Sequence, residues 1–509
     1  MNILAIESSC DETAAAILST SPQKIAHNVP FSPKISSNSP KSQFSSDSQI
    51  SSNFSLSSNS PILLSNVVVS QIDIFKAYGG VIPEIAARSH LEAILPVIDK
   101  AFADANFLTP KNLPDWDKID FIAVTNTPGL LGSLLVGTLT ARTLALLHKK
   151  PLYAVHHLKS HIFSCWLPAQ SKSPKNLQSS LLPQSLQSSQ SIQSPQPIQS
   201  PTAPNHPNQP NSPQFPLLAL VISGGHTQII RMTSETSFEI VGTTLDDAIG
   251  ECFDKVAKIL GLPYPGGPSI SKAANGILPT QISTNSPSDD LQTSLKSSKN
   301  PQTSPDSSNN SPSSSKNQTK REKPGNPEKY QLPIPNIKDL DFSFSGLKTA
   351  VLRAVQKEVG VPISYPSHEL KNLLTPEQIC DFAASFEKTA VDILLKKLKK
   401  ALKIYPDTRS ILFAGGVSAN PLLRKSANSL KNYSSYYSPH DINNSAKSSK
   451  SCSTHNTYSS HDINIFFPAP EFSGDNAAMV AMAAFYEIKS NLPPTDPYSL
   501  SILPRSEIN

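Results

Sequence analysis

Two stretches of this chain repeat one pattern: an apolar run, a short polar turn and a second apolar run. They are NILAIESSCDETAAAIL at residues 2–18 and PLLALVISGGHTQIIRM at residues 216–232. Each pattern predicts two strands joined at a tip of small and polar residues. Because the same hairpin occurs twice, we expect the chain to fold as two related α/β halves.

Strand and helix patterns alternate along the rest of the apolar sequence. Apolar residues at helical spacing indicate helices, and short apolar runs that end in turns indicate strands. Such alternation is typical of an α/β fold with two sheets. Helices are expected at residues 89–105, 132–149, 246–262 and 380–405, a buried strand at 119–129, and strand-to-helix units at 410–425 and 463–487.

Four tracts of the chain consist largely of Ser, Pro, Asn and Gln. Such sequence cannot bury enough apolar area to offset the entropy lost on ordering. About 340 of the 509 residues remain for packed structure, which is enough for two domains. We therefore expect disordered insertions between structural elements, where long loops are tolerated. The tracts span residues 20–60, 167–214, 279–329 and 432–462.

Composition narrows the class of protein. The formal net charge of +5 permits a nucleic-acid partner without requiring one. The five cysteines form no CxxC pair, which argues against a disulfide framework or a thiolate zinc site and fits a reducing compartment. The N-terminal segment lacks the basic start of a signal peptide, and no uninterrupted apolar run reaches the length of a membrane span. We therefore expect a cytoplasmic protein that does not enter a membrane.

Three turns rich in Gly or Ser follow apolar strands: ESSCDET, ISGGHT and AGGVSAN. Backbone N–H groups in such turns can hold phosphate, and a helix N-terminus adds positive potential. One such turn is weak evidence because glycines in tight turns are common, but three in one α/β chain favour phosphate or nucleotide binding. None matches GxxxxGK[ST] or GxGxxG, which excludes a P-loop and a simple Rossmann site.

Three of the twelve histidines, His156, His157 and His161, lie in one short segment. If a helix begins after LYAV, His157 and His161 share one face and can bind a metal, although solvated or core histidines show the same spacing. Asp475 can complete a two-His, one-carboxylate site, or it can cap the helix that follows. Leu158 stands where the HExxH peptidase motif needs its glutamate, so peptidase chemistry is poorly supported.

Eight motifs of this chain together resemble one family, the TsaD-type tRNA N6-adenosine threonylcarbamoyltransferases. In order they are IESSCDET, YGGVIPEIAARSHLEAI, VHHLKSH, LVISGGHTQII, GECFDKVAKILGLPYPGGP, DFSFSGLKTAV, AGGVSANPLLR and SGDNAAM. The resemblance implies an actin/Hsp70/sugar-kinase-like fold, with two related domains around a nucleotide cleft. We place the first lobe at residues 1–150 and the second, with the metal and adenylate sites, at 151–509. The last helix can return to the first lobe.

The resemblance also implies a reaction. Such enzymes transfer the threonylcarbamoyl group from threonylcarbamoyl-AMP to N6 of adenosine 37 in tRNAs that read codons beginning with A. The implied cofactor is one divalent metal per subunit, Fe2+ as the usual assignment and Zn2+ as the alternative. The implied partners are tRNA, a TsaB-like paralogue and a TsaE-like ATPase. Two competing hypotheses are a kinase-like or carbamoyltransferase relative of the same fold and a non-catalytic subunit, and the histidine pair weighs against both.

The resemblance assigns roles to individual residues. The implied metal ligands are His157, His161 and Asp475. The residues implied to contact the adenylate are Val221, Ile222, Ser223, Gly224 and Gly225. Asp254 and Gly267 are implied to hold the sugar of the nucleotide, and Asn420 to contact the nucleoside. Asp11 and Glu12 are implied to line the same cleft.

The chemistry of acyl transfer suits these groups. A metal can polarise and orient the donor, N–H groups of the glycine turn can stabilise the departing phosphate, and Asp11 or Glu12 can accept the proton of the amine. Outside the motif context, Asp254 would be a surface charge near Lys258, and Asn420 would be a simple turn or cap residue.

A few positions depart from the family's pattern. Lys159 and Ser160 replace the Glu-Gly that commonly precedes the last histidine, and Thr127 replaces a glycine. We expect the metal site to be kept and its surroundings to differ. The run LLKKLKKALK is either a tRNA-binding patch or, more simply, the solvated face of an amphipathic helix.

Overall fold

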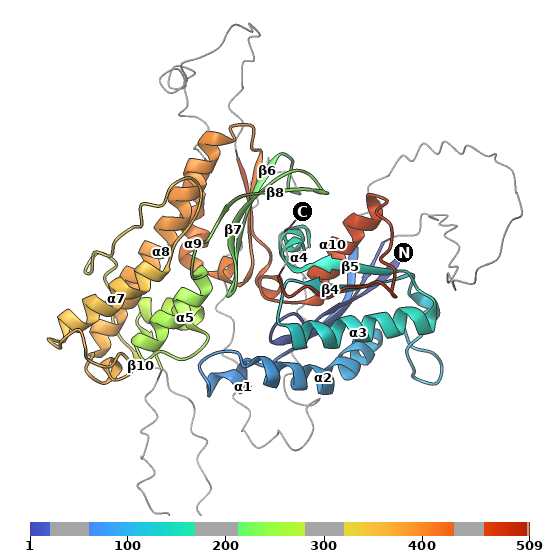
Figure 1. The fold of residues 1–509 in the computed structure, drawn as a ribbon, viewed down its shortest axis with the longest axis horizontal. Coiled ribbons are helices and arrows are strands. Elements are labelled where there is room, and N and C mark those ends of the chain that lie inside the picture. The colour runs from blue at the N-terminus through green and yellow to red at the C-terminus, as the bar shows by residue number, and fades with distance from the viewer. Residues whose placement is uncertain (21–60, 168–211, 280–319, 432–462, 506–507, 509) are drawn as a thin grey trace, which may run out of the picture.

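The computed structural model describes most of the apolar sequence (Figure 1). The described residues are 1–20, 61–167, 212–279, 320–431, 463–505 and 508. The four predicted polar tracts, 20–60, 167–214, 279–329 and 432–462, therefore lie outside the described residues except at some of their ends.

The first predicted hairpin forms the centre of a five-stranded sheet. Strands β1, β2 and β3 pair antiparallel, β4 runs parallel to β1, and β5 runs parallel to β4, so the order is β3-β2-β1-β4-β5. The strands span Asn2–Glu7 (β1), Glu12–Ser19 (β2), Ile62–Ser70 (β3), Phe121–Thr127 (β4) and Leu152–His156 (β5). The lobe boundary after residue 150 stays a prediction, while the first sheet ends with β5.

The second predicted hairpin occupies the same place in a second sheet. Its order is β12-β11-β6-β7-β8, with β6, β7 and β8 antiparallel and with β11 and β12 parallel to β6. The strands span Leu217–Ile222 (β6), Thr227–Ser234 (β7), Ser237–Thr243 (β8), Ser410–Ala414 (β11) and Asn464–Phe466 (β12). The two sheets share one topology, which confirms the prediction of two related α/β halves.

The helices follow the predicted segments closely. They span Ile72–Lys76 (α1), Pro83–Asp104 (α2), Leu131–His148 (α3), His157–Phe163 (α4), Ile249–Ile259 (α5), Gly266–Ala274 (α6), Ser345–Glu358 (α7), Pro376–Ile404 (α8), Pro421–Ala427 (α9) and Ala477–Lys489 (α10). Short 3-10 turns lie at Trp116–Lys118, Ser164–Trp166, Leu370–Asn372, Gly416–Ala419, Asn428–Leu430 and Pro470–Phe472, and a two-residue ladder joins Ile277–Leu278 (β9) to Lys320–Arg321 (β10).

The helices form three layers around the two sheets (Figure 1). Alternate residues of a strand point to opposite faces, so Leu4 of β1 packs beneath α2 and α3 while Ile3 and Ala5 face α4 and α10. Leu217 of β6 faces that same middle core, whereas Leu218 packs on the side of α5 and α8. Helices α4 and α10 therefore lie between the two sheets, and each central strand contributes to two cores.

Helix α8 begins with the cap that its sequence encodes. The side chain of Thr375 accepts the N–H of Gln378, and the Gln378 side chain accepts the N–H of Thr375, with Pro376 at the first helical position. One face of the 29-residue helix packs in the core with α6.

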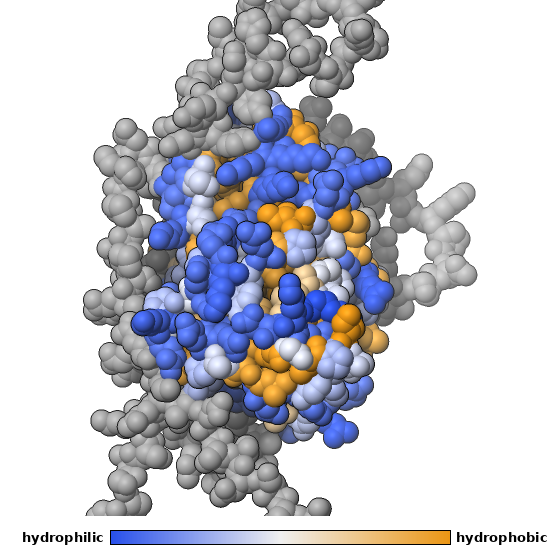
Figure 2. All heavy atoms as spheres, turned by 90° about the vertical axis from the view of Figure 1, so that its left-hand side faces the viewer, coloured by the Kyte–Doolittle hydropathy of each residue, from blue (hydrophilic) through white to orange (hydrophobic). Residues whose placement is uncertain are grey.

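The side of the molecule that carries α7 and α8 presents a largely hydrophilic surface (Figure 2).

The end of the third predicted tract is packed rather than free, which corrects its boundary at residue 329. Asp381 of α8 is buried and accepts the N–H of Asn326 at 2.7 Å and the Nζ of Lys329 at 2.7 Å. A Cβ on Gly325 would lie 2.0 Å from the carbonyl oxygen of Cys380. Composition places residues 322–329 in the tract, but the hydrogen bonds of Asn326 and Lys329 to the buried carboxylate of Asp381 hold this segment on α8.

Two predicted insertions begin and end at paired strands. In the β2–β3 ladder, Ser19 is the partner of Ile62. In the β9–β10 ladder, Leu278 is the partner of Lys320. The two ends of each insertion are therefore held at adjacent positions of the fold.

Helix α3 is long and apolar enough to cross a membrane by length and composition. It packs against β4 and α2, however, as part of the outer layer of the first sheet. Leu135 and Leu139 of α3 are 37% and 48% exposed, and Leu91 and Leu95 of α2 are 66% and 58% exposed. We call these four residues the leucine face, because each pair repeats at the spacing of one helical turn.

Candidate metal and nucleotide site

Helix α4 begins directly after LYAV, as the histidine pattern required. His156 caps the helix, since its Nδ1 accepts the N–H of Leu158 at 3.2 Å. His157 and His161 lie one turn apart, both are buried, and their rings are 4.5 Å apart between centroids. The predicted shared face of His157 and His161 is found, and His156 has a structural role as the cap of this helix.

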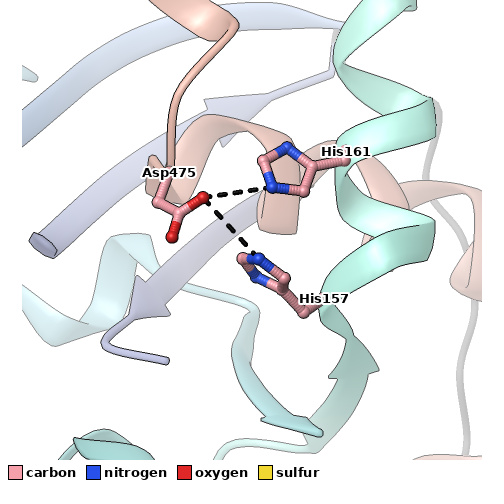
Figure 3. Close-up of side chains that lie close together, drawn as sticks. All are labelled: His157, His161 and Asp475. Atoms are coloured by element: carbon pink, nitrogen blue, oxygen red, sulfur yellow. Dashed lines mark ion pairs between the residues drawn. The ribbon is translucent and has the colours of Figure 1, made fainter. Parts of the chain in front are cut away.

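Asp475 meets the two histidines from the loop before α10 (Figure 3). Its Oδ1 lies 3.6 Å from Nε2 of His157 and 3.1 Å from Nε2 of His161. The cap of α10 is Asn476, whose side chain accepts the N–H of Met479 at 3.0 Å. The alternative that Asp475 only caps the helix is therefore wrong.

The three side chains fit a divalent metal ion. Their ligand atoms all lie within 4.8 Å of one another. A metal about 2.1 Å from each atom would separate neighbouring ligands by about 3.0–3.4 Å, according to its geometry. In addition, Nε2 of His161 is buried and has no hydrogen-bond partner among the described residues, although Asp475 is adjacent. The lone pair of this Nε2 atom is buried without a hydrogen-bond donor among the described residues, which suits binding to a metal ion.

Glu7, at the end of β1, supports the cluster from behind. Its Oε2 lies 3.3 Å from Nδ1 of His157, and it accepts the hydroxyl of Thr125 at 2.6 Å. The N–H of Ser9 donates to the other carboxylate oxygen at 2.6 Å. A carboxylate on Nδ1 favours the tautomer of His157 whose Nε2 is free to bind a metal. Glu7 is fully buried, so this arrangement is sheltered from water.

Electrostatic interactions within the cluster are strong. Burial alone would lower the pKa of His157, but the charges of Asp475 and Glu7 outweigh burial and raise it to about 9. Burial alone would raise the pKa of Asp475, yet the charges of His157 and His161 hold it well below its usual range. Burial and the same two histidines lower the pKa of His226 to about 4. His226 follows the glycine turn, so this turn lies within electrostatic reach of the cluster.

The predicted turn at residues 221–225 divides into a buried part and an exposed part. Val221 and Ile222 end β6 with fully buried side chains, which leaves half-buried Ser223 and the exposed Gly224 and Gly225 as the tip. The tip rests on the start of α5, where the N–H of Gly250 donates to the carbonyl of Ser223 at 3.2 Å. Added Cβ atoms on Gly224 or Gly225 would meet nothing within 4 Å, so the tip faces open space.

Hydrogen bonds link the other predicted nucleotide residues into one wall. Asp254 of α5 accepts the N–H of Gly266 at 2.6 Å, directly before Gly267. Burial raises the pKa of Asp254 to about 6. The next turn of α6 brings Ser271 to the buried Glu387 of α8.

Glu387 also connects this wall to the third glycine turn. It accepts Nδ2 of Asn420 at 2.7 Å, while Oδ1 of Asn420 accepts the N–H of Leu423 at 2.9 Å. Asn420 is therefore the N-cap of α9, which agrees with the alternative that it is a turn or cap residue. Gly415, at φ +87°, begins this turn close to the carbonyl of Ile222, so the second and third glycine turns lie side by side.

Asp11 and Glu12 lie at the tip of the first hairpin and hydrogen-bond to each other. Burial, the adjacent Asp11 charge and Asp475 raise the pKa of Glu12 well above its ordinary value. Buried His90 supports the tip, because its Nε2 lies 3.0 Å from the carbonyl oxygen of Cys10. The charge of Asp475 acts on Asp11 and that of Asp11 acts on Asp254, so the tip of the first hairpin lies within electrostatic reach of both the metal cluster and the nucleotide wall.

Sequence reasoning missed several of these groups. Glu7, His90 and Glu387 carry no spacing signal, because their partners lie far away in the sequence. A buried glutamate at a strand end and one in the middle of an apolar helix face were the available signs, since ionisable groups are rarely buried without a partner. That the surroundings of the metal site differ from those in the family stays a prediction; at one of the substituted positions, Lys159 places its Nζ 4.6 Å from the ring centre of Phe238.

Comparison with known proteins agrees with the family that the sequence motifs indicate. The chain matches the model of the TsaD family, tRNA N6-adenosine threonylcarbamoyltransferase, over residues 62–179, 202–304 and 302–482. A relative of that name from Thermomicrobium roseum is 31% identical over 496 residues, which cover 96% of this chain and 92% of the relative. Another from Thermosipho africanus is 33% identical over 494 residues, covering 97% and 96%. Among solved structures, full-length HypF in the phosphate- and nucleotide-bound form aligns with a TM-score of 0.36 and 10% identity, covering 74% of this chain and 40% of HypF.

Proposed function

Because the chain belongs to the TsaD family of tRNA N6-adenosine threonylcarbamoyltransferases, we propose that it forms threonylcarbamoyladenosine at adenosine 37 of tRNAs that read codons beginning with A. The proposed donor is threonylcarbamoyl-AMP, and AMP is the leaving product. The observation that best supports this proposal is the meeting of His157, His161 and Asp475 beside the exposed glycine turn at residues 223–225.

The proposed cofactor is one Fe2+ ion per chain, with Zn2+ as the alternative. Two imidazoles and one carboxylate suit both ions and leave positions open for substrate oxygens. A bound ion would polarise and hold the carbonyl or phosphate oxygens of the donor. His157, His161 and Asp475 supply the lone pairs, and Glu7 holds the proton of His157 on Nδ1, away from the site.

The glycine turns supply the donor site in this proposal. Gly224 and Gly225 have open space beside them, and their N–H groups can stabilise the negative charge of the departing phosphate, whereas the N–H of Ser223 is bonded to the carbonyl of His226 at 2.9 Å. Asp254 and Gly267 would hold the sugar, and Asn420 the nucleoside. The wall from α5 through Glu387 to Asn420 fixes these groups relative to one another.

Asp11 is the group that we propose to accept the proton of the attacking amine. Glu12 has the higher affinity for a proton, because it is buried beside two negative charges. A protonated Glu12 would donate to Asp11 and leave Asp11 as the carboxylate. We therefore expect Asp11→Asn to slow the transfer step more than Glu12→Gln does.

The proposed protein partners are a TsaB-like paralogue and a TsaE-like ATPase, and the proposed location is the cytoplasm. The leucine face is a suitable surface for the paralogue, since exposed apolar rows on two adjacent helices usually mark a protein contact. A helix pair from the partner would bury these leucines as a four-helix contact.

The experiment that tests the function is reconstitution with threonylcarbamoyl-AMP, tRNA and the two partner proteins, followed by mass analysis of the tRNA nucleosides. The wild-type chain should form threonylcarbamoyladenosine and hold about one metal ion. The double variant His157→Ala, His161→Ala should lose both the modified nucleoside and the metal ion. The control variant His368→Ala changes an exposed histidine in the segment before α8 and should alter neither the nucleoside yield nor the metal content. Full activity of the double variant would contradict the proposal. Phosphoryl transfer from ATP to a small substrate would favour the kinase-like alternative.

A further inference from the structure

A cavity of about 700 Å3 lies on the outer side of α8, apart from the metal cluster and the glycine turns. Its walls are the second half of α8, the segment at residues 334–337 and the end of α9. We call it the lysine groove, after the five α8 side chains that line it. These are Lys396, Lys397, Lys399, Lys400 and Lys403.

The groove carries a strong excess of positive charge. The one carboxylate in its described lining, Asp392, is paired with Lys388 at 2.7 Å. Lys396, Lys400 and Lys403 are exposed and follow the spacing of one helix face. The charges of Lys396 and Lys400 repel that of Lys397, although Nζ of Lys400 also donates to the carbonyl oxygen of Asp339 at 3.0 Å. An anion in the groove would relieve this repulsion.

The groove is built into the fold rather than formed by flexible surface chains. Lys397 is buried, and its Nζ donates to the carbonyl oxygens of Ile337 at 2.8 Å and Asp339 at 3.0 Å. These bonds tie the opposite wall to α8. The hydrogen bonds of the Lys397 ammonium group go to neutral carbonyls, and the charges of Asp339 and Asp341 offset part of its charge without forming an ion pair with it among the described residues.

Helix α8 also connects the groove to the proposed nucleoside site. Glu387 on this helix bonds Asn420. Lys396 follows nine residues later, which is about 14 Å along the axis, and Lys403 lies about 24 Å along. These lengths are short compared with a folded RNA, so one tRNA can contact both places.

We propose that the lysine groove binds the phosphate backbone of the tRNA outside the anticodon loop. This inference rests on the proposed function, which makes tRNA the substrate. Regularly spaced lysines recognise phosphates as charges and not by base sequence. The groove would therefore position the tRNA body while the modified adenosine enters the cleft.

The test compares three charge variants of the full chain, each with three substitutions. The first replaces Lys396, Lys400 and Lys403 with Gln, and the second replaces the same residues with Arg, which keeps the charge. The matched control replaces three exposed lysines elsewhere with Gln. These are Lys111, Lys323 and Lys357. For each variant, tRNA affinity is measured over a range of salt concentrations, and the KM for tRNA and kcat are measured in the reconstituted reaction.

The Gln variant of the groove should bind tRNA about tenfold more weakly or worse, and the slope of log affinity against log salt should fall by about 2–3. Its KM for tRNA should rise while kcat at saturating tRNA is kept, and the Arg variant should restore binding. An unchanged slope and KM in the groove variant would overturn this inference while leaving the transferase function intact. Loss of partner assembly with an unchanged tRNA slope would overturn it in favour of an acidic protein. A wild-type chain that forms no modified nucleoside would instead refute the proposed function.

Discussion

Gly250 offers a sharp test of the donor site, because an alanine there would push on the exposed glycine turn. It is the second residue of α5, and a Cβ at this position would lie 2.5 Å from the carbonyl oxygen of Ser223 and 2.9 Å from Cα of Gly224. Heavy atoms in contact normally lie about 3.5 Å apart, so the turn must move by about 1 Å. Such overpacking destabilises a fold by about 1–3 kcal/mol.

The catalytic effect should be as large as the upper end of the effect on stability, since a 100-fold loss of rate corresponds to about 2.7 kcal/mol. A displacement of about 1 Å in a positioning group can lower a rate about 100-fold, so Gly250→Ala should lower kcat/KM for threonylcarbamoyl-AMP by about that factor. The matched control is Gly346→Ala, at the second residue of α7, where a Cβ would meet nothing within 4 Å. This control should stabilise the chain by up to about 1 kcal/mol, as alanine normally does in a helix.

Thermal unfolding, AMP binding by calorimetry and initial rates with threonylcarbamoyl-AMP would measure these effects. A Gly250→Ala chain with wild-type rate and AMP affinity would refute the placement of the donor phosphate on this turn. Reduced stability without a change in the rate would mean that the contact is structural only.

Three further predictions follow from the site and its surroundings. Metal binding needs neutral His157, and the pKa of this residue in the metal-free site is about 9. Metal affinity should therefore fall about tenfold per pH unit as the pH drops below 9. Chelator competition from pH 6.5 to 9.5 would measure this slope, and a flat profile would contradict the prediction. The folded pKa of Asp254, about 6, lies above its ordinary value, so its ionisation opposes folding at pH 7. Asp254→Asn should therefore raise the melting temperature at pH 7, with little gain at pH 4, while weakening donor binding; a lower melting temperature at pH 7 would be inconsistent with this pKa. Leu135→Glu with Leu139→Glu should leave the chain folded and abolish its complex with the paralogue on gel filtration, and an intact complex would place the partner elsewhere.

Local patterns predicted most of the fold. Each hairpin was recognisable because its strands are short, apolar and bounded by small polar residues, and both hairpins form the centres of sheets. The start of α4 at His157 was predictable because the residues before it read as a buried strand. Composition failed at residues 322–329, where one buried carboxylate, Asp381, orders a segment whose own side chains give little sign of packing.

The site was predictable only where a motif carried it. His157 and His161 share a helix face, so their proximity follows from spacing, but Asp475 reaches them through the packing of α10 between the sheets. Glu7 and Glu387 were missed because their roles depend on hydrogen bonds between segments far apart in the sequence. No local rule specifies which buried carboxylate meets which histidine or amide.

Because paired strands hold the two ends of an insertion, the stability of the enzyme depends only weakly on the length of that insertion. Because Ser19 pairs with Ile62 and Leu278 with Lys320, the ladder closes each loop whatever the number of residues between. A loop of about 40 residues costs about 2 kcal/mol more chain entropy to close than a loop of about 4, since this cost grows with the logarithm of length. Doubling a loop that is already this long costs only about 0.6 kcal/mol more, so genetic drift can lengthen or rewrite these loops at little further energetic penalty. Conversely, excising either one and joining its strands with a tight turn should yield a smaller catalyst whose metal ligands keep their places.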